Sequence, residues 1–278
     1  MDEHIAFLLE KYGKNDQRTD EWHQKRGQML TASEIYKACV DASPASKHEI
    51  IISKLNPKSS GGCGARALIW GTRFEPIAKD IYCYMYPGLE IHDTTCIPHP
   101  DHSFLGASPD GILKHSDSTH ELHGRLIEIK CPISRVLDDS PTSVTYMCQM
   151  QLQMECTGLK KCEFVEMKFK ELTYTEWVDS KAQYKSFYAV MADGAVSYKH
   201  FNDTRNIETW RKEVLNNDED SRMLFWELTE SRMKTVDHDP TWITTNIESF
   251  KQVWDSVVQH RAAGTFPRNP KDVSTLIL

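Results

Sequence analysis

The chain has 278 residues, a formal net charge of −7 at pH 7, 26% charged residues and 40% hydrophobic residues. That length can bury a substantial core in one large domain or two small ones, and the composition is ordinary for a globular protein. No apolar run approaches the roughly 18 residues of a membrane span, and the N-terminus Met1-Asp2-Glu3-His4 lacks a basic-then-apolar leader. Membrane insertion and secretion are therefore not expected.

Helices are predicted over about residues 2–12, from Thr19-Asp20 onward, and over about 66–86, the last carrying Glu75. Between them, Thr31 or Ser33 is expected to cap another helix, because a hydroxyl can bond the free amides of a first turn. Residues 57–64 consist largely of turn-forming residues and are expected to form a loop.

Strands are predicted near residues 89–97, 104–108, 111–114 and 124–131, and, after a helix near 143–157, at 162–169 and 171–177. Beyond Trp177 the spacing of apolar residues predicts mainly helix, through Trp210, Val214 and later Met223 to Leu228. The simplest architecture is one α/β domain over 1–278, with a core at about 18–178 and a mainly helical C-terminal portion at about 179–278.

The most informative pattern is Pro109-Asp110 followed by Glu128-Ile129-Lys130. Asp110 opens an Asp-Gly turn, which is a strong hairpin indicator, and 17 positions separate it from Glu128. Glu128 and Lys130 are two residues apart in a predicted strand and so project from the same face. Pairing of the two strands would bring two carboxylates and an ammonium group together.

Like-charged carboxylates held that close need a cation, and hard oxygen ligands favour Mg²⁺, with Mn²⁺ as a substitute. We expect Asp110, Glu128 and the Ile129 carbonyl to hold the principal ion, with Glu75 completing its shell directly or through water. Lys130 would orient or deprotonate the attacking water. The alternative is a surface hairpin with an ordinary Glu/Lys face.

Several segments, in order, resemble the lambda-exonuclease/YqaJ viral recombinase family of the PD-(D/E)XK nuclease superfamily. They are Arg18–Arg26, Thr31–Glu34, Trp70–Glu75, Ser108–Gly111, Glu128–Pro132 and Tyr146–Gln151. The resemblance covers roughly residues 18 to 170. It implies a restriction-endonuclease-like core, a mixed central sheet flanked by helices, and the same roles for Glu75, Asp110, Glu128 and Lys130. The interval from Asp110 to Glu128 is long for this family, and His115 to Gly124 is interpreted as an enlarged hairpin loop.

Gln149 is a further candidate for the active site. On a helix Gln149 and Gln151 lie about 200° apart, so both cannot face one pocket, whereas Tyr146, Gln149 and Gln153 share a face. The resemblance also selects Gln149 as the active-site glutamine. The alternative is a surface helix rich in glutamine.

Arg26, Ser33 and Thr31 are predicted to form a terminal-phosphate site. A helix that begins near Thr31 would offer free amides to an anion, and Arg26 adds a planar fork suited to phosphate oxygens. In the resembled family the matching arginine and serine bind the 5′-phosphate of a duplex end. Trp22 is interpreted as a core residue rather than as a base-stacking one.

The negative net charge argues against a highly basic DNA coat, but phosphate contacts need only a local basic patch. Candidates for that patch are Arg18, Lys25, Arg26, Arg66 and Arg73. For each of them except Arg26, a solvated charge on a helix face is the favoured interpretation.

Two other kinds of metal centre are not expected. Six histidines fall between His92 and His123, but their spacing matches no known zinc pattern, so a zinc site there is not expected. An iron–sulfur cluster needs four grouped cysteines, and Cys131 and Cys148 do not supply them. The eight cysteines are scattered without a Cys-x-x-Cys pair, which predicts reduced thiols in an intracellular compartment, the cytosol or nucleus.

These observations predict a Mg²⁺-dependent DNA exonuclease that degrades one strand of linear duplex DNA from a 5′-phosphorylated end, in viral or phage recombination or end processing. The expected partners are double-stranded DNA ends and, by resemblance, a single-strand annealing protein and two further copies of the chain in a homotrimer. One alternative is a structure- or site-specific endonuclease on the same fold. Another is a catalytically silent DNA-end-binding module, against which the intact set Glu75, Asp110, Glu128 and Lys130 argues.

Overall fold

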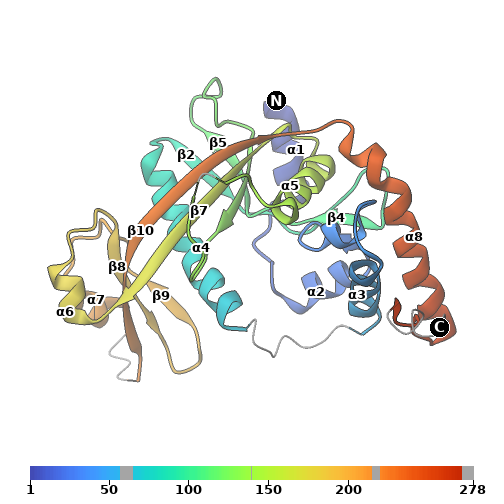
Figure 1. Cartoon of the computed structure of the whole chain (residues 1–278). Coiled ribbons are helices and arrows are strands. Elements are labelled where there is room, and N and C mark those ends of the chain that lie inside the picture. Colours follow the sequence, from blue (N-terminus) through green and yellow to red (C-terminus); the bar gives the residue numbers. More distant parts are fainter. Residues whose placement is uncertain (57–64, 139, 215–219, 271–278) are drawn as a thin grey trace.

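The computed structural model describes residues 1–56, 65–138, 140–214 and 220–270. Within these ranges, two sheets with helices against their faces make up the architecture (Figure 1). The predicted loop at 57–64 lies outside the described residues.

The larger sheet has seven strands in the order β2-β5-β6-β7-β10-β8-β9. Their bounds are β2 Leu89–His92, β5 Gly111–His115, β6 Leu126–Lys130, β7 Lys161–Leu172, β8 Lys185–Val190, β9 Val196–Tyr198 and β10 Arg222–Asp237. The sheet is mixed, since β6 and β7 pair in parallel whereas the β5–β6 and β7–β10 pairs are antiparallel. The smaller sheet contains β1 Leu30–Thr31, β4 Leu105–Ala107 and β3 Ile97–Pro98, in that order.

The helices are α1 Asp2–Tyr12, α2 Asp20–Gly27, α3 Pro44–Leu55, α4 Ala65–Met85, α5 Val144–Thr157, α6 Tyr174–Asp179, α7 Ile207–Val214 and α8 Trp242–Ala263, with a short 3₁₀ helix, η1, at Ile35–Ala38. None of the helices in the described ranges is long and apolar enough to cross a bilayer.

Alternation along β6 decides which side chains face which helix. Ile127 and Ile129 pack in the cluster that contains Phe74 and Ile81 of α4, whereas Leu126 packs with Met150 of α5 on the opposite face. Because successive side chains of a strand point to opposite faces, Glu128 and Lys130 lie on the α5 side. Helix α5 also packs against the smaller sheet and α8, so it is covered on both flanks. This placement fixes α5 beside the carboxylate of Glu128.

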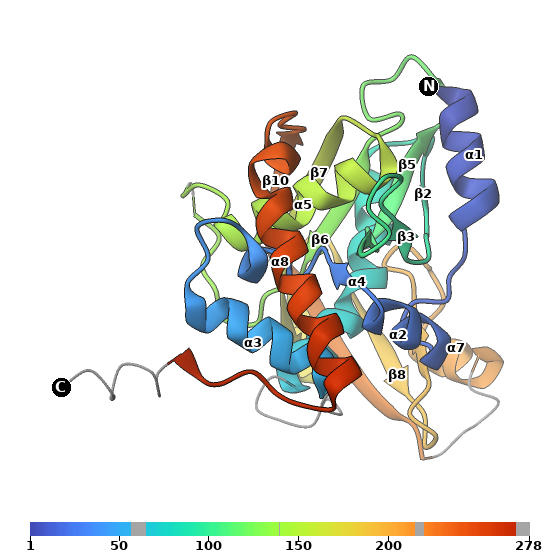
Figure 2. The same ribbon diagram turned by 90° about the vertical axis from the view of Figure 1, so that its right-hand side faces the viewer.

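The C-terminal portion agrees only in part with prediction. Helix α8 is present, and Figure 2 shows it beside α3. The predicted helix through Met223 and Leu228 is wrong, because these residues belong to the 16-residue strand β10, which pairs with both β7 and β8. Strands from the predicted core and from the predicted C-terminal portion therefore belong to one sheet. That the whole chain is a single nuclease domain stays a prediction.

The predicted strand at 171–177 is also wrong. Strand β7 continues to Leu172, and α6 begins directly after Thr173, which forms a capping box with Glu176. The Thr173 hydroxyl accepts a hydrogen bond from the Glu176 main-chain N–H, and the Glu176 carboxylate accepts one from the Thr173 main-chain N–H. These two bonds satisfy free N–H groups at a helix start, so a helix begins here instead of a further strand.

Candidate active site

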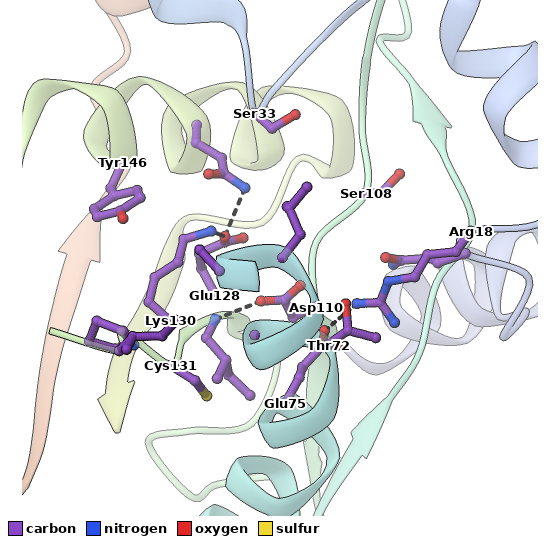
Figure 3. A pocket seen from close by; sticks show the side chains of 18 of the residues that line it. Arg18, Ser33, Thr72, Glu75, Ser108, Asp110, Glu128, Lys130, Cys131 and Tyr146 are labelled. Carbon is purple, nitrogen blue, oxygen red and sulfur yellow. Dashed lines mark hydrogen bonds and ion pairs between the residues drawn. The ribbon is translucent and has the colours of Figure 1, made fainter. Parts of the chain in front are cut away.

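A cavity of about 480 Å³ brings together most of the residues predicted for the site (Figure 3). Its lining includes Glu75, Asp110, Glu128, Ile129, Lys130, Gln149, Arg26 and Ser33. Thr31 does not line this cavity, but its hydroxyl accepts a hydrogen bond from Arg26.

Asp110 immediately precedes β5, which pairs with β6. The hairpin turn predicted at Asp110-Gly111 is wrong, because β4 before it belongs to the smaller sheet and β5 after it to the larger one. The Oδ2 atom of Asp110 accepts the main-chain N–H of Ile129 at 2.6 Å, so it lies against the end of β6. Burial, together with the nearby negative charges of Glu128 and Glu75, holds the pKa of Asp110 well above its usual range. The ionised form of Asp110 is therefore unfavourable here, and the Lys130 cation offsets this only in part.

Glu128 is a buried carboxylate, only 1% exposed, with both oxygens occupied. Gln149 donates from Nε2 to Oε1 at 2.7 Å, and Gln153 donates to Oε2 at 2.6 Å. Both glutamines come from one face of α5, as their spacing of four predicts. Gln151 points elsewhere and donates to the Asp237 carbonyl.

Lys130 pairs with the carboxylate of Glu128, as expected for neighbours on one strand face. Its ammonium also lies 5.1 Å from the ring centroid of Tyr146 on α5. Burial alone would lower the pKa of Lys130, but the negative charges of Glu128 and Asp110 outweigh it and raise the pKa. In this arrangement Lys130 is a cation.

Glu75 reaches the cavity from α4 and already has two cationic partners. Arg18 Nη2 lies 2.6 Å from Oε2, and Lys79 Nζ lies 3.2 Å from Oε1. Arg18 has a φ of 75°, an uncommon left-handed backbone conformation for a residue other than glycine. Sequence reasoning proposed Arg18 as a DNA contact but missed its pairing with Glu75, from which it is separated by 57 positions.

Arg26, in the last turn of α2, also lines the cavity. Its guanidinium donates to three hydroxyls, those of Thr31 (3.1 Å), Ser33 (3.0 Å) and Ser108 (3.4 Å). It also lies 4.3 Å from the ring centroid of Trp22. Burial lowers the pKa of Arg26, but arginine remains charged at ordinary pH.

Two expectations at this end of the site are wrong. Thr31 does not cap a helix, since it lies in β1 and its main-chain N–H donates to Glu34. The helix that follows, η1, has four residues and no side-chain cap, so it offers no substantial dipole to an anion. Trp22 is not a core residue. It lines the cavity, and its indole N–H donates to Ser108.

Of the other candidates for a basic patch, Lys25 donates to the Cys96 carbonyl, away from this cavity. Arg135, which sequence reasoning missed, lines the cavity near Tyr146 and pairs with Glu166.

In the described part of the chain, no three His, Cys, Asp or Glu side chains converge as a ready-made metal-binding group. A cation between Asp110 and Glu128 would therefore also need main-chain or water oxygens. The Ile129 N–H faces Asp110, and in a strand the N–H and C=O of one residue point to the same side. The Ile129 carbonyl thus also faces Asp110, and this donor set of hard oxygens fits Mg²⁺ or Mn²⁺.

Residues 21–160, which are 140 of the 278 residues, match the YqaJ-like viral recombinase domain. The chain belongs to this family. The matched range includes every residue predicted for the site.

Two viral proteins are similar in sequence to this family member. An uncharacterized protein of Acanthamoeba polyphaga mimivirus is 30% identical over 184 residues, which cover 62% of this chain and 32% of that protein. A protein of African swine fever virus is 28% identical over 158 residues, 49% of this chain and 44% of that protein. The chain thus aligns with less than half the length of either relative.

Solved structures show the same fold. An alkaline exonuclease from Laribacter hongkongensis superposes with a TM-score of 0.52 at 20% identity, covering 93% of this chain and 100% of that one. The structure of that enzyme in complex with dAMP gives a TM-score of 0.52 at 19% identity. The predicted α/β fold, a mixed central sheet flanked by helices, is thereby confirmed.

Proposed function

We propose that the protein is a Mg²⁺-dependent deoxyribonuclease of the PD-(D/E)XK type that degrades one strand of linear duplex DNA from a 5′-phosphorylated end. The observation that carries this proposal is the convergence of Asp110, Glu128, Lys130 and Arg26 on one cavity. The carboxylates and Lys130 can act on a phosphodiester while Arg26 holds a terminal phosphate.

The residues divide the chemistry as follows. Asp110, Glu128 and the Ile129 carbonyl would hold Mg²⁺, which when bound polarises the phosphate oxygens and assists the leaving oxygen. Gln149 and Gln153 keep the Glu128 carboxylate oriented toward Asp110 and Lys130. Lys130, as a cation, orients the attacking water and stabilises negative charge on the phosphate.

Glu75 would support the metal through water or directly. Direct coordination requires Glu75 to leave Arg18 or Lys79, each of which occupies one of its oxygens. If Glu75 leaves Arg18, the Arg18 guanidinium becomes free to contact a phosphate. Arg18 can therefore pair with Glu75 in this structure and still belong to the predicted basic patch.

Arg26 is suited to a terminal phosphate because its three hydrogen-bond partners in the described part of the chain are neutral hydroxyls. A cation that is mostly removed from water and bonded to neutral groups gains most from an incoming anion. The hydroxyls of Ser33 and Ser108 can donate to the same phosphate.

The test is digestion of end-labelled linear duplex, with and without a 5′-phosphate, in Mg²⁺ and in EDTA. We expect Mg²⁺-dependent release of mononucleotides from the 5′ side, faster with the phosphate, leaving single-stranded DNA with an intact 3′ end. Covalently closed circles should survive. Cutting of closed circles would replace this proposal with an endonuclease on the same fold, and binding to ends without cleavage would replace it with a silent end-binding module.

By the same family relationship we propose a setting in viral DNA recombination or end processing, with a single-strand annealing protein as partner and a homotrimer as assembly. All seven cysteines in the described ranges are free, in keeping with the reducing intracellular compartment that we propose.

A further inference from the structure

Helix α2 carries Arg26, and the carbonyl groups at its C-terminal end accept hydrogen bonds from cationic side chains of two helices that are distant in the sequence. Lys54, in the last turn of α3, donates from Nζ to the Arg26 carbonyl at 3.1 Å. Arg261, near the end of α8, donates from Nη2 to the Gly27 carbonyl at 2.7 Å and to the Lys54 carbonyl at 2.9 Å. Cations at a helix C-terminus bond its free carbonyls and complement its dipole.

Lys54 also belongs to a chain of contacts that reaches the Arg26 side chain. Its Nζ lies 2.5 Å from Glu34 Oε1, and only 8% of its side chain is exposed. Glu34 Oε1 in turn accepts the Thr31 hydroxyl at 2.9 Å. Since the Thr31 proton goes to Glu34, its oxygen lone pair is left to accept from Arg26.

Arg26 is thus held from both ends: Lys54 bonds its carbonyl directly, and Lys54, Glu34 and Thr31 together orient its guanidinium. Burial lowers the pKa of Lys54, and the Glu34 carboxylate opposes that change, so each ion depends on the other for compensation. Loss of Lys54 would leave Glu34 unpaired and loosen the Thr31 hydroxyl.

We propose that Lys54 and Arg261 are positioning residues for recognition of the 5′-terminal phosphate, acting through Arg26. This inference rests on the proposed function. It adds a role for α8, which lies outside the matched range 21–160 and packs beside α3 (Figure 2). The C-terminal helix would then tune selection of the DNA end without touching DNA.

The experiment compares kcat/KM on 5′-phosphorylated and 5′-hydroxyl duplexes of one sequence, for the full-length wild type and for the Lys54→Met and Arg261→Met variants. We expect each variant to lose about fivefold or more of the phosphate preference, the factor that corresponds to one ordinary hydrogen bond. Arg261 is exposed, so its variant folds even if Lys54→Met does not. The matched control is Lys47→Met, because Lys47 is also on α3 but donates to Ser249 of α8 rather than to α2.

A double variant separates positioning from general weakening of the fold. If Lys54 and Arg261 act through Arg26, neither substitution should lower the phosphate preference further in an Arg26→Ala background. Suppose that Arg26→Ala lowers the preference for 5′-phosphorylated duplex while Lys54→Met and Arg261→Met keep the wild-type preference. This result would overturn the present inference and leave the proposed function standing. Equal losses on both duplexes would also overturn it. A wild type without any phosphate preference would overturn both.

Discussion

Gln153 donates its side-chain amide to Glu128 at 2.6 Å in a place closed to solvent, since Gln153 is 0% and Glu128 is 1% exposed. A buried carboxylate is tolerated only where donors and cations compensate it. Gln153, Gln149 and Lys130 together do this for Glu128. The same contacts that make the charge tolerable therefore also fix its direction within the site.

We predict that Gln153→Leu lowers both stability and turnover. Removing a donor to a buried charged acceptor should cost about 1.5 to 3 kcal/mol, measured by urea unfolding, and the misdirected carboxylate should lower kcat. The matched control is Gln151→Leu on the same helix, which loses hydrogen bonds to Asp237 and Asp239 instead. It should lose stability but keep kcat. If Gln153→Leu and Gln151→Leu have equal kcat, Gln153 contributes to the stability of the fold and not to turnover.

The metal is tested by Asp110→Asn. The raised pKa of Asp110 means that its ionised form is unfavourable in the folded protein, so the neutral variant should be as stable as wild type or more stable in EDTA. The wild-type Tm should rise with Mg²⁺ or Mn²⁺, whereas the variant should lose this increment and its cleavage. Asp93→Asn, in a carboxylate that pairs with Lys79, is the control and should keep the increment. Wild-type cleavage in EDTA at the Mg²⁺ rate would contradict the assignment.

Lys130→Ala should bind Mg²⁺ and DNA but cut about 10²-fold more slowly, because the water and the phosphate lose their oriented cation. Lys130→Arg should restore activity only partly, since the planar guanidinium cannot replace a compact ammonium beside Tyr146. Single-turnover cleavage at saturating enzyme measures the effect. Lys170→Ala, on an exposed lysine of β7, is the control. If Lys130→Ala turns over DNA at close to the wild-type rate, the role of Lys130 is limited to its structural ion pair with Glu128.

The placement of Glu128, Lys130, Gln149 and Gln153 could be predicted because short sequence periods decide it. A spacing of two places Glu128 and Lys130 on one strand face. A spacing of four places Gln149 and Gln153 together on α5. Each of these relations depends on the local geometry of one strand or one helix, and not on how distant segments pack.

What sequence reasoning missed depends on remote packing. The run from Met223 to Leu228 is apolar without a decisive period, and only pairing with β7 and β8 makes it a strand. Thr31 resembles a helix cap, but β1 pairs with β4 and commits it to a strand. The pair formed by Arg18 and Glu75 joins α4 to a loop before α2, which no local spacing could reveal.

The last prediction concerns the 5′-phosphate. Arg26→Ala should lower digestion of 5′-phosphorylated duplex toward the rate on 5′-hydroxyl duplex, because Arg26 lines the cavity but belongs to a different element from Asp110 and Lys130. A charge-assisted phosphate contact contributes about 1.5 to 3 kcal/mol, which corresponds to a loss of about 10- to 150-fold. Initial rates on the two duplexes measure it. The control is Lys25→Ala, which removes the neighbouring cation on α2 that bonds Cys96 instead. If Arg26→Ala slows both duplexes equally, the arginine supports the fold, and the phosphate must be recognised elsewhere.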